Sequence, residues 1–153
     1  MVSENETLRA KLKEYELLIE ELSAPIIPSV IPDTILVPLM GTLTEQRFQL
    51  IQTKILESVS VDHSDTILID FTGISIKDVS QMGLVGLSNQ VTQLKKALDI
   101  MGVETIFSGF SPEFVRAIVG AGVDVDNLKV HASFRTALQH VMKEKRLDFM
   151  SMK

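Results

Sequence analysis

The 153-residue sequence predicts an α/β fold in which one amphipathic helix precedes a mixed, mostly parallel sheet with helices. Two observations lead to this prediction. From residue 24 onward, short apolar runs alternate with segments of helical periodicity, and strands that alternate with helices form parallel sheets through crossovers. Before residue 24, the apolar residues recur at heptad spacing among charged residues.

Residues 1–23 form the predicted amphipathic helix. Ser3 and Glu6 provide a capping box at its start, and Pro25 disfavours helical geometry at the preceding residue. Its apolar residues lie four and three positions apart in turn: Leu8, Leu12, Tyr15, Ile19 and Leu22. Two interpretations stay open, a short coiled coil that pairs two chains and a helix packed on its own domain. We prefer the coiled coil, and with it a homodimer.

Residues 25–30 and 34–40 predict a β-hairpin. The first segment contains two prolines, which suit an edge strand because proline cannot donate to a sheet ladder. Pro32 and Asp33 form the turn between the strands, and Gly41 ends the second strand.

Thr44 is the expected N-cap of the next helix. The apolar face of that helix consists of Phe48, Ile51, Ile55 and Val59. A polar loop at 62–65 precedes the continuous apolar run 66–71, which is typical of a central strand covered on both faces. A loop over 72–78 then leads to a long helix from about Ser80 to Met101.

The next strand is predicted at 103–108. Ser111 and Pro112 begin a helix after it, because serine caps well and proline is favoured at the first helical position. Two glycines near residue 120 end this helix.

A short strand at 128–130 and a helix from Ser133 to about Lys145 complete the predicted fold. We therefore expect three parts: a linker helix at 1–23, one domain at 24–146 and a loose tail at 147–153.

The composition argues against several kinds of partner. The chain has no cysteine, so it has no disulfide and no thiolate nucleophile. Its net charge is −5, and its one basic cluster, Lys143, Lys145 and Arg146, is interrupted by Glu144, whereas nucleic acids require dense positive charge. No signal sequence is visible, and no stretch approaches the roughly 18 apolar residues that span a bilayer. We expect a cytoplasmic protein that binds neither nucleic acid nor membrane.

The sequence contains no HExxH, GxSxG or Walker motif. Its histidines, His63, His131 and His140, do not have the spacing of metal ligands. Asp70 ends the central strand without a glycine loop or a second carboxylate beside it, so we interpret it as an anchor for the following loop. We expect no catalytic residue, no metal and no cofactor.

Hydroxyl side chains follow two neighbouring strands. Thr42 and Thr44 come after the second strand, and Thr72, Ser75 and Ser80 come after the third. Loops at the carboxyl ends of strands often carry function in α/β folds. A phosphate near a helix N-terminus is favoured by the dipole and the free N–H groups there. For Thr44 and Ser80, helix capping is the alternative role.

Two motifs resemble the STAS domain, whose name covers sulphate transporters and anti-sigma-factor antagonists. They are DFTG at 70–73 and SGFSPE at 108–113, in the right order around the right elements. The segments 21–28 and 37–47 are closer still to RsbR-type stressosome proteins, which include blue-light-sensing relatives with a LOV domain. The resemblance covers residues from about 21 to 142.

The resemblance implies a non-catalytic scaffold in the general stress pathway. Such proteins join STAS paralogues in an assembly that holds a switch serine/threonine kinase. The kinase phosphorylates the STAS domains and is then released to activate regulators of an alternative sigma factor. The alternative function that we retain is a sensor that binds a small molecule or nucleotide through the same loops.

The resemblance also implies two phosphoacceptor positions. Thr42 matches the first, in the Gly41-Thr42 pair after the second strand. The second follows Asp78 and is Val79 here, which cannot accept phosphate. Ser80 lies one residue later, where a helix turns its side chain by about 100°. We expect the partner-binding loops to contain Gly41, Thr42, Thr44, Asp78, Val79 and Ser80.

Overall fold

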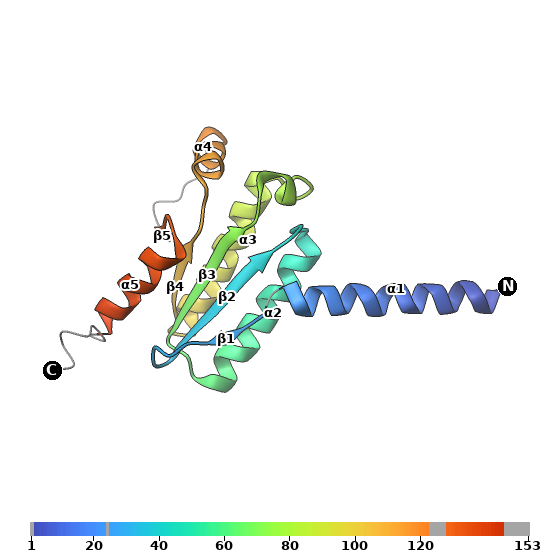
Figure 1. The fold of residues 1–153 in the computed structure, drawn as a ribbon, viewed down its shortest axis with the longest axis horizontal. Helices are drawn as coiled ribbons and strands as arrows, with labels where there is room; N and C mark the ends of the chain where they lie inside the picture. Colours follow the sequence, from blue (N-terminus) through green and yellow to red (C-terminus); the bar gives the residue numbers. More distant parts are fainter. Residues whose placement is uncertain (1, 24, 123–127, 146–153) are drawn as a thin grey trace.

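The computed structural model describes residues 2–23, 25–122 and 128–145. Five strands form one sheet in the order β1-β2-β3-β4-β5. The elements along the chain are α1 (Val2–Ser23), β1 (Ile27–Pro28), β2 (Thr34–Met40), α2 (Glu45–Asp62), β3 (Thr66–Gly73), the 3-10 turn η1 (Ile76–Val79), α3 (Gly83–Ile100), β4 (Glu104–Ser108), α4 (Pro112–Gly120), β5 (Lys129–His131) and α5 (Phe134–Glu144) (Figure 1). The predicted tail at 147–153 lies outside the described residues.

The sheet is mixed and mostly parallel, which confirms the predicted fold class. Strands β2 to β5 run parallel to one another, and β1 pairs antiparallel with β2 as a short hairpin. The centre of the sheet is β3, whose residues 66–69 are all buried. Burial on both faces explains why its sequence is continuously apolar instead of alternating.

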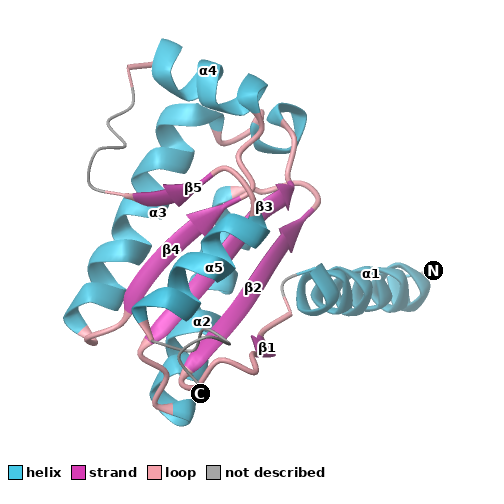
Figure 2. Ribbon diagram, turned by 60° about the vertical axis from the view of Figure 1, so that its left-hand side comes forward, coloured by secondary structure: helices cyan, strands magenta, loops and turns pink. Residues whose placement is uncertain are grey.

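Helices cover both faces of the sheet (Figure 2). Successive side chains of a strand point to opposite faces, so Ile67 and Ile69 join the larger core with α2 and α3. Leu68 faces the other way and joins a smaller core under α5. Helix α4 lies beyond the carboxyl ends of the strands, above the sheet in Figure 2. No helix within the described ranges is long and apolar enough to span a membrane.

The carboxyl end of β2 is irregular. Its register against β3 shifts between Pro38 and Met40, near a proline that has no N–H for a ladder hydrogen bond. Gly73 faces this end, and a Cβ there would lie 2.8 Å from the Leu39 carbonyl oxygen. This close approach brings the segment after β2 tightly against the end of β3.

Several predicted boundaries were wrong. The first strand, predicted at 25–30, spans only Ile27–Pro28, and β3, predicted at 66–71, continues to Gly73. The long helix begins at Gly83, not near Ser80, because Gly83 has a φ of +77° that breaks the right-handed helical path. The turn η1 occupies part of the predicted loop at 72–78. Helix α2 runs through Asp62, into the predicted polar loop, and ends where His63 adopts a left-handed conformation with φ of 54°.

Helix α1 extends away from the sheet and its covering helices (Figure 1). The described side chains of its apolar stripe are exposed: Leu8 by 59%, Leu12 by 60% and Tyr15 by 62%. The interpretation of a helix packed on its own domain is wrong for these three residues. The side chains of Ile19 and Leu22 lie outside the described part of the chain.

Candidate partner-binding surface

The two loops singled out in the sequence meet at the carboxyl edge of the sheet. The Leu43 N–H donates a hydrogen bond of 2.7 Å to the carbonyl oxygen of Asp78. Leu43 itself is fully buried, so it fixes the first loop to the core. The parallel arrangement of β2 and β3 brings together two segments that lie about 35 positions apart in the chain.

Gly41 and Arg47 shape the first loop. Gly41 has a φ of +79°, a backbone conformation that glycine adopts without strain. The guanidinium of Arg47 is buried and donates hydrogen bonds of 2.6 Å to the carbonyl oxygens of Met40 and Thr42. These bonds hold the backbone of Thr42 while its side chain is exposed.

Thr44 caps helix α2, as predicted from the sequence. Its hydroxyl oxygen accepts a hydrogen bond of 3.1 Å from the Arg47 N–H. The capping role leaves Thr44 half-buried. Thr42 lies two residues before Thr44, the N-cap of the 18-residue helix α2, where the dipole favours negative charge.

The second loop is held by Asp78. Its carboxylate accepts hydrogen bonds from the Ser75 N–H at 2.9 Å and the Ser75 hydroxyl at 3.0 Å. Val79 is almost completely buried in the larger core, whereas Ser80 is exposed. The proposed capping role of Ser80 on the long helix is wrong, because Ser80 closes η1 and Met82 occupies the N-cap position of α3.

Asp70 anchors the neighbouring strand ends, which confirms its predicted role. One carboxylate oxygen, Oδ1, accepts hydrogen bonds of 2.8 Å from the hydroxyls of Thr72 and Ser108. Ser108 is fully buried. Gly109 passes so close that a Cβ there would lie 2.4 Å from Asp70 Oδ1. The DFTG and SGFSPE motifs therefore meet in space and set the ends of β3 and β4.

Phe110, from the second motif, extends this arrangement into the core. Its ring lies 4.9 Å from that of Phe71 and stacks 5.3 Å from that of Phe114, measured between centroids. Phe114 begins the buried face of α4, whose N-cap Ser111 accepts from the Phe114 N–H at 3.1 Å. The motif thus joins α4 to the sheet.

A polar groove opens beside the two loops, between the start of α2 and the first half of α3. Its volume is about 600 Å³. Its lining is rich in amide side chains: Thr44, Glu45, Gln46, Gln81, Met82, Gly86, Asn89, Gln90 and Gln93. Amides both donate and accept hydrogen bonds, so the groove suits an uncharged polar surface such as a peptide backbone. The sequence analysis did not identify this groove, because its two walls are distant in the chain.

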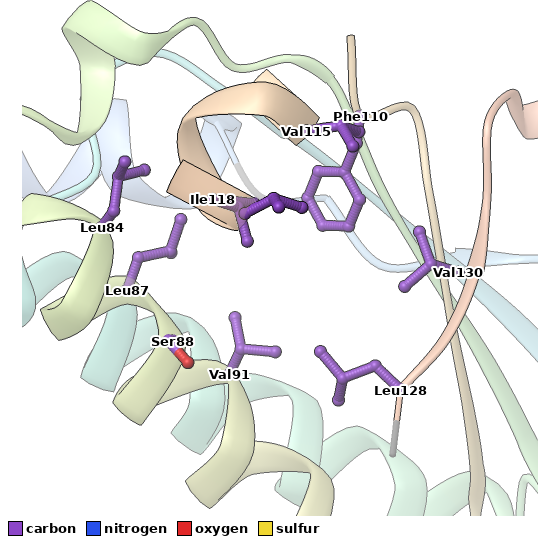
Figure 3. Close-up of a pocket in the computed structure, with 10 residues that line it drawn as sticks. Leu84, Leu87, Ser88, Val91, Phe110, Val115, Ile118, Leu128 and Val130 are labelled. Atoms are coloured by element: carbon purple, nitrogen blue, oxygen red, sulfur yellow. The ribbon is translucent and has the colours of Figure 1, made fainter. Parts of the chain in front are cut away.

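A separate apolar cavity of about 110 Å³ lies between α3, α4 and β5 (Figure 3). Its side chains are apolar except for one serine: Leu84, Leu87, Ser88, Val91, Phe110, Val115, Ile118, Val119, Leu128 and Val130. Such a lining holds no group that could neutralise phosphate. Periodicity alone could not reveal the cavity, since the same residues would also suit a filled core.

Comparison with known proteins shows which curated proteins this chain is similar to. No family model matches the chain. Among curated proteins, the RsbT co-antagonist protein RsbRD of Bacillus subtilis is 32% identical over 84% of this chain and 44% of its own length. RsbRA of the same organism is 27% identical over 84% of this chain and 44% of its own length. A blue-light photoreceptor of Listeria innocua is 27% identical over 79% of this chain and 45% of its own length.

Solved structures show which fold this is. RsbS of Moorella thermoacetica matches with a TM-score of 0.64 at 15% identity, over 80% of this chain and 97% of its own. The anti-sigma factor antagonist SpoIIAA matches with a TM-score of 0.57 at 20% identity, over 78% of this chain and 96% of its own. The fold is the STAS fold. The homologues of this chain are RsbR-type proteins and photoreceptors, as the resemblance in the sequence indicates.

The match to the curated relatives covers only part of them. The chain spans about half the length of RsbRA and RsbRD. On this fold, the loops around Thr42 and Ser80 occupy one exposed edge. The residues that follow Thr42 and precede Ser80, Leu43 and Val79, are buried.

Proposed function

We propose that the chain is a non-catalytic regulatory and scaffold module of a cytoplasmic general stress pathway. In this proposal it binds STAS paralogues and a switch serine/threonine kinase through the edge formed by Gly41, Thr42, Thr44, Asp78 and Ser80. The observation that carries the proposal is the Leu43–Asp78 hydrogen bond, which joins both loops into one surface. Named relatives support it, since they include RsbT co-antagonists and a component of the stressosome.

Phosphorylation of Thr42 is the proposed control of this surface. The side chain is exposed and lies beside the N-terminus of α2. A phosphate there would add about two negative charges at the positive end of the helix dipole. A structure of SpoIIAA in a phosphorylated form supports such control in a protein of the same fold. Ser80 is the second proposed acceptor, because it is exposed beside the same loop.

Incubation with a cognate switch kinase and ATP, followed by mass spectrometry, tests the acceptor. We expect phosphate on Thr42 in the wild type. The total amount of phosphate per chain should be lower in Thr42→Ala. The matched control is Thr53→Ala, since Thr53 is an exposed threonine in the middle of α2. An unmodified Thr42 in the wild type, or an equal total of phosphate in Thr42→Ala, would contradict the assignment. Ser80→Ala measures the second site in the same way.

A pull-down from native cytosol tests the scaffold role. We expect the chain to retain STAS-domain proteins and a serine/threonine kinase, identified by mass spectrometry. Thr42→Glu should alter the recovery of these partners, because it places a charge at the proposed interface, whereas Thr53→Glu should not. Recovery of neither class of partner would refute the proposal.

A second candidate function is the sensing of a small molecule. The cavity of Figure 3 favours it, and its apolar lining favours a small apolar ligand over a nucleotide. A ligand that binds the folded state raises the melting temperature. Addition of small aromatic compounds should therefore raise Tm in the wild type and less so in Leu87→Phe, which fills the cavity; an unchanged Tm would remove this candidate.

A further inference from the structure

Three side chains able to bind a metal meet at the amino end of β4, away from the candidate partner-binding surface at the carboxyl ends of the strands. Glu104 is the first residue of β4, and His140 and Glu144 lie on α5. One potential ligand atom from each side chain lies within 4.8 Å of the other two. The helix residues are four positions apart, which places them on one face of α5.

One cation and one imidazole ring already lie beside these carboxylates. Lys129, on the neighbouring strand β5, forms an ion pair with Glu104. His140 Nε2 lies 2.9 Å from the Glu144 carboxylate. Two carboxylates this close repel each other unless positive charge lies between them. The pKa of Glu104 is raised by burial, but the hydrogen bond and the charge of Lys129 outweigh burial and hold it below the ordinary value.

We propose that Glu104, His140 and Glu144 bind a zinc ion, which replaces the ammonium group of Lys129. The donor set is one imidazole nitrogen and two carboxylate oxygens. Zinc accepts both kinds of donor, whereas magnesium and calcium prefer oxygen alone. The two carboxylates would balance the two positive charges of the ion, so zinc satisfies the site more completely than a single ammonium group.

The structure gives the ion a route of entry and the lysine a route of exit. Glu104, His140 and Glu144 keep 30%, 38% and 37% of their side-chain surface exposed, so water can reach the site and complete the coordination. The side chain of Lys129 is 54% exposed on a flexible stem, and it can turn into solvent. Zinc bonds of about 2.0–2.1 Å require the three ligand atoms to move closer together, which rotation of these surface side chains permits.

Zinc titration of the full chain, without a histidine tag, tests the proposal by calorimetry. We expect one zinc ion per chain. His140→Ala and Glu144→Gln should each weaken zinc binding at least tenfold, because each removes one of three ligands. Lys129→Met should instead tighten it about tenfold, because it removes the competing cation while keeping a similar stem. Glu113→Gln, at the exposed start of α4, is the matched control and should leave the affinity unchanged.

Cobalt substitution adds a spectroscopic measurement. Co²⁺ bound by these ligands should absorb visible light more strongly than hydrated Co²⁺ in the wild type, and no more strongly than hydrated Co²⁺ in His140→Ala. Circular dichroism of each variant checks that the fold persists. If His140→Ala unfolds, Glu144→Gln still tests the site, because Glu144 is exposed. The absence of zinc binding would overturn the proposal, and so would equal affinity in the wild type and the ligand variants. If the affinity for zinc does not rise in Lys129→Met, the proposed replacement of the Lys129 ammonium group by zinc is wrong.

Discussion

Gly109 shows how one residue sets the local geometry of the surface. Its φ is +83°, and a Cβ would lie within 2.5 Å of three atoms of Asp70 and Thr72, one of them a backbone nitrogen. Because backbone cannot move aside as a flexible side chain can, no other residue fits at this position. Asp70 Oδ1, one of these three atoms, also accepts the hydrogen bond from the Ser108 hydroxyl.

Gly109→Ala should lower the free energy of unfolding by about 3 kcal/mol, through backbone strain and steric overlap. Gly102→Ala is the matched control, because Gly102 has a similar φ of +77° with nothing within 4 Å of a Cβ. It should cost about 1 kcal/mol, from backbone strain alone. Urea denaturation measures the free energy of unfolding of both variants. Equal losses of stability would show that steric overlap with Asp70 and Thr72 adds nothing to the cost of Gly109→Ala.

At Val79, burial of the side chain, and not backbone geometry, restricts which residue fits. It follows Asp78 at the position where the family resemblance implies a phosphoacceptor, yet it is only 1% exposed. A hydroxyl at this position would point into the larger core. Burial therefore explains why an apolar side chain suits this chain, and it favours Thr42 as the main acceptor.

Val79→Thr should lower the free energy of unfolding by about 1–3 kcal/mol, because the added hydroxyl is removed from water. Val85→Thr is the comparison, since Val85 is 60% exposed on α3. It should change stability by less than about 0.5 kcal/mol. Thermal and urea unfolding provide the values, and a stable Val79→Thr variant would mean that the core offers the hydroxyl a partner.

At the level of elements, α1 carries apolar side chains that no other described residue covers. Leu8, Leu12 and Tyr15 are all more than half exposed. Exposed apolar residues at heptad spacing indicate pairing with another helix. We therefore propose that two copies of the chain pair through α1, which leaves the edge around Thr42 available to other partners.

Light scattering should give a mass of twice 17.0 kDa for the wild type. Leu12→Glu should shift the chain toward monomer, because it places a charge in the apolar stripe. Ala10→Glu adds the same charge on the same helix outside the stripe, and this variant should stay dimeric. A dimer that survives both Leu12→Glu and deletion of residues 2–22 would place the interface on the globular part.

At the level of the whole molecule, Lys145 joins three distant parts of the chain. Its ammonium group donates to the Pro32 carbonyl oxygen at 2.6 Å and forms an ion pair with Asp65. These contacts link the end of α5 to the turn before β2 and to the start of β3. Burial raises the pKa of Asp65, but hydrogen bonds from Lys145 and Thr66 outweigh burial and lower the pKa below 3.8.

This lowered pKa predicts a pH dependence of stability. The unfolded chain binds a proton at Asp65 more readily than the folded chain, so the contribution is present above the unfolded pKa and is lost as pH falls through the folded pKa. Lys145→Met should raise the pKa of Asp65 and reduce this acid-dependent loss. The effect should be below about 1 kcal/mol, since the carboxylate is 57% exposed. NMR titration of the Asp65 carboxyl carbon would reveal an unchanged pKa if the ion pair were absent in solution.

Local sequence was sufficient to predict each described α-helix and strand, though not the turn η1, and it was sufficient for several of their ends. The limits of β2, predicted at 34–40, are those in the structure, because Gly41 cannot continue the strand beyond Met40. The caps Thr44, Ser111 and Ser133 each accept from an N–H three residues later, an interaction that depends only on neighbours in the chain.

Only the tertiary structure shows which distant residues meet at the candidate partner-binding surface and at the proposed zinc site. The Leu43–Asp78 hydrogen bond depends on parallel pairing of β2 and β3, and the cluster of Glu104, His140 and Glu144 depends on α5 crossing β4. Periodicity describes which face of an element is apolar, but it carries no information about which distant element will cover that face.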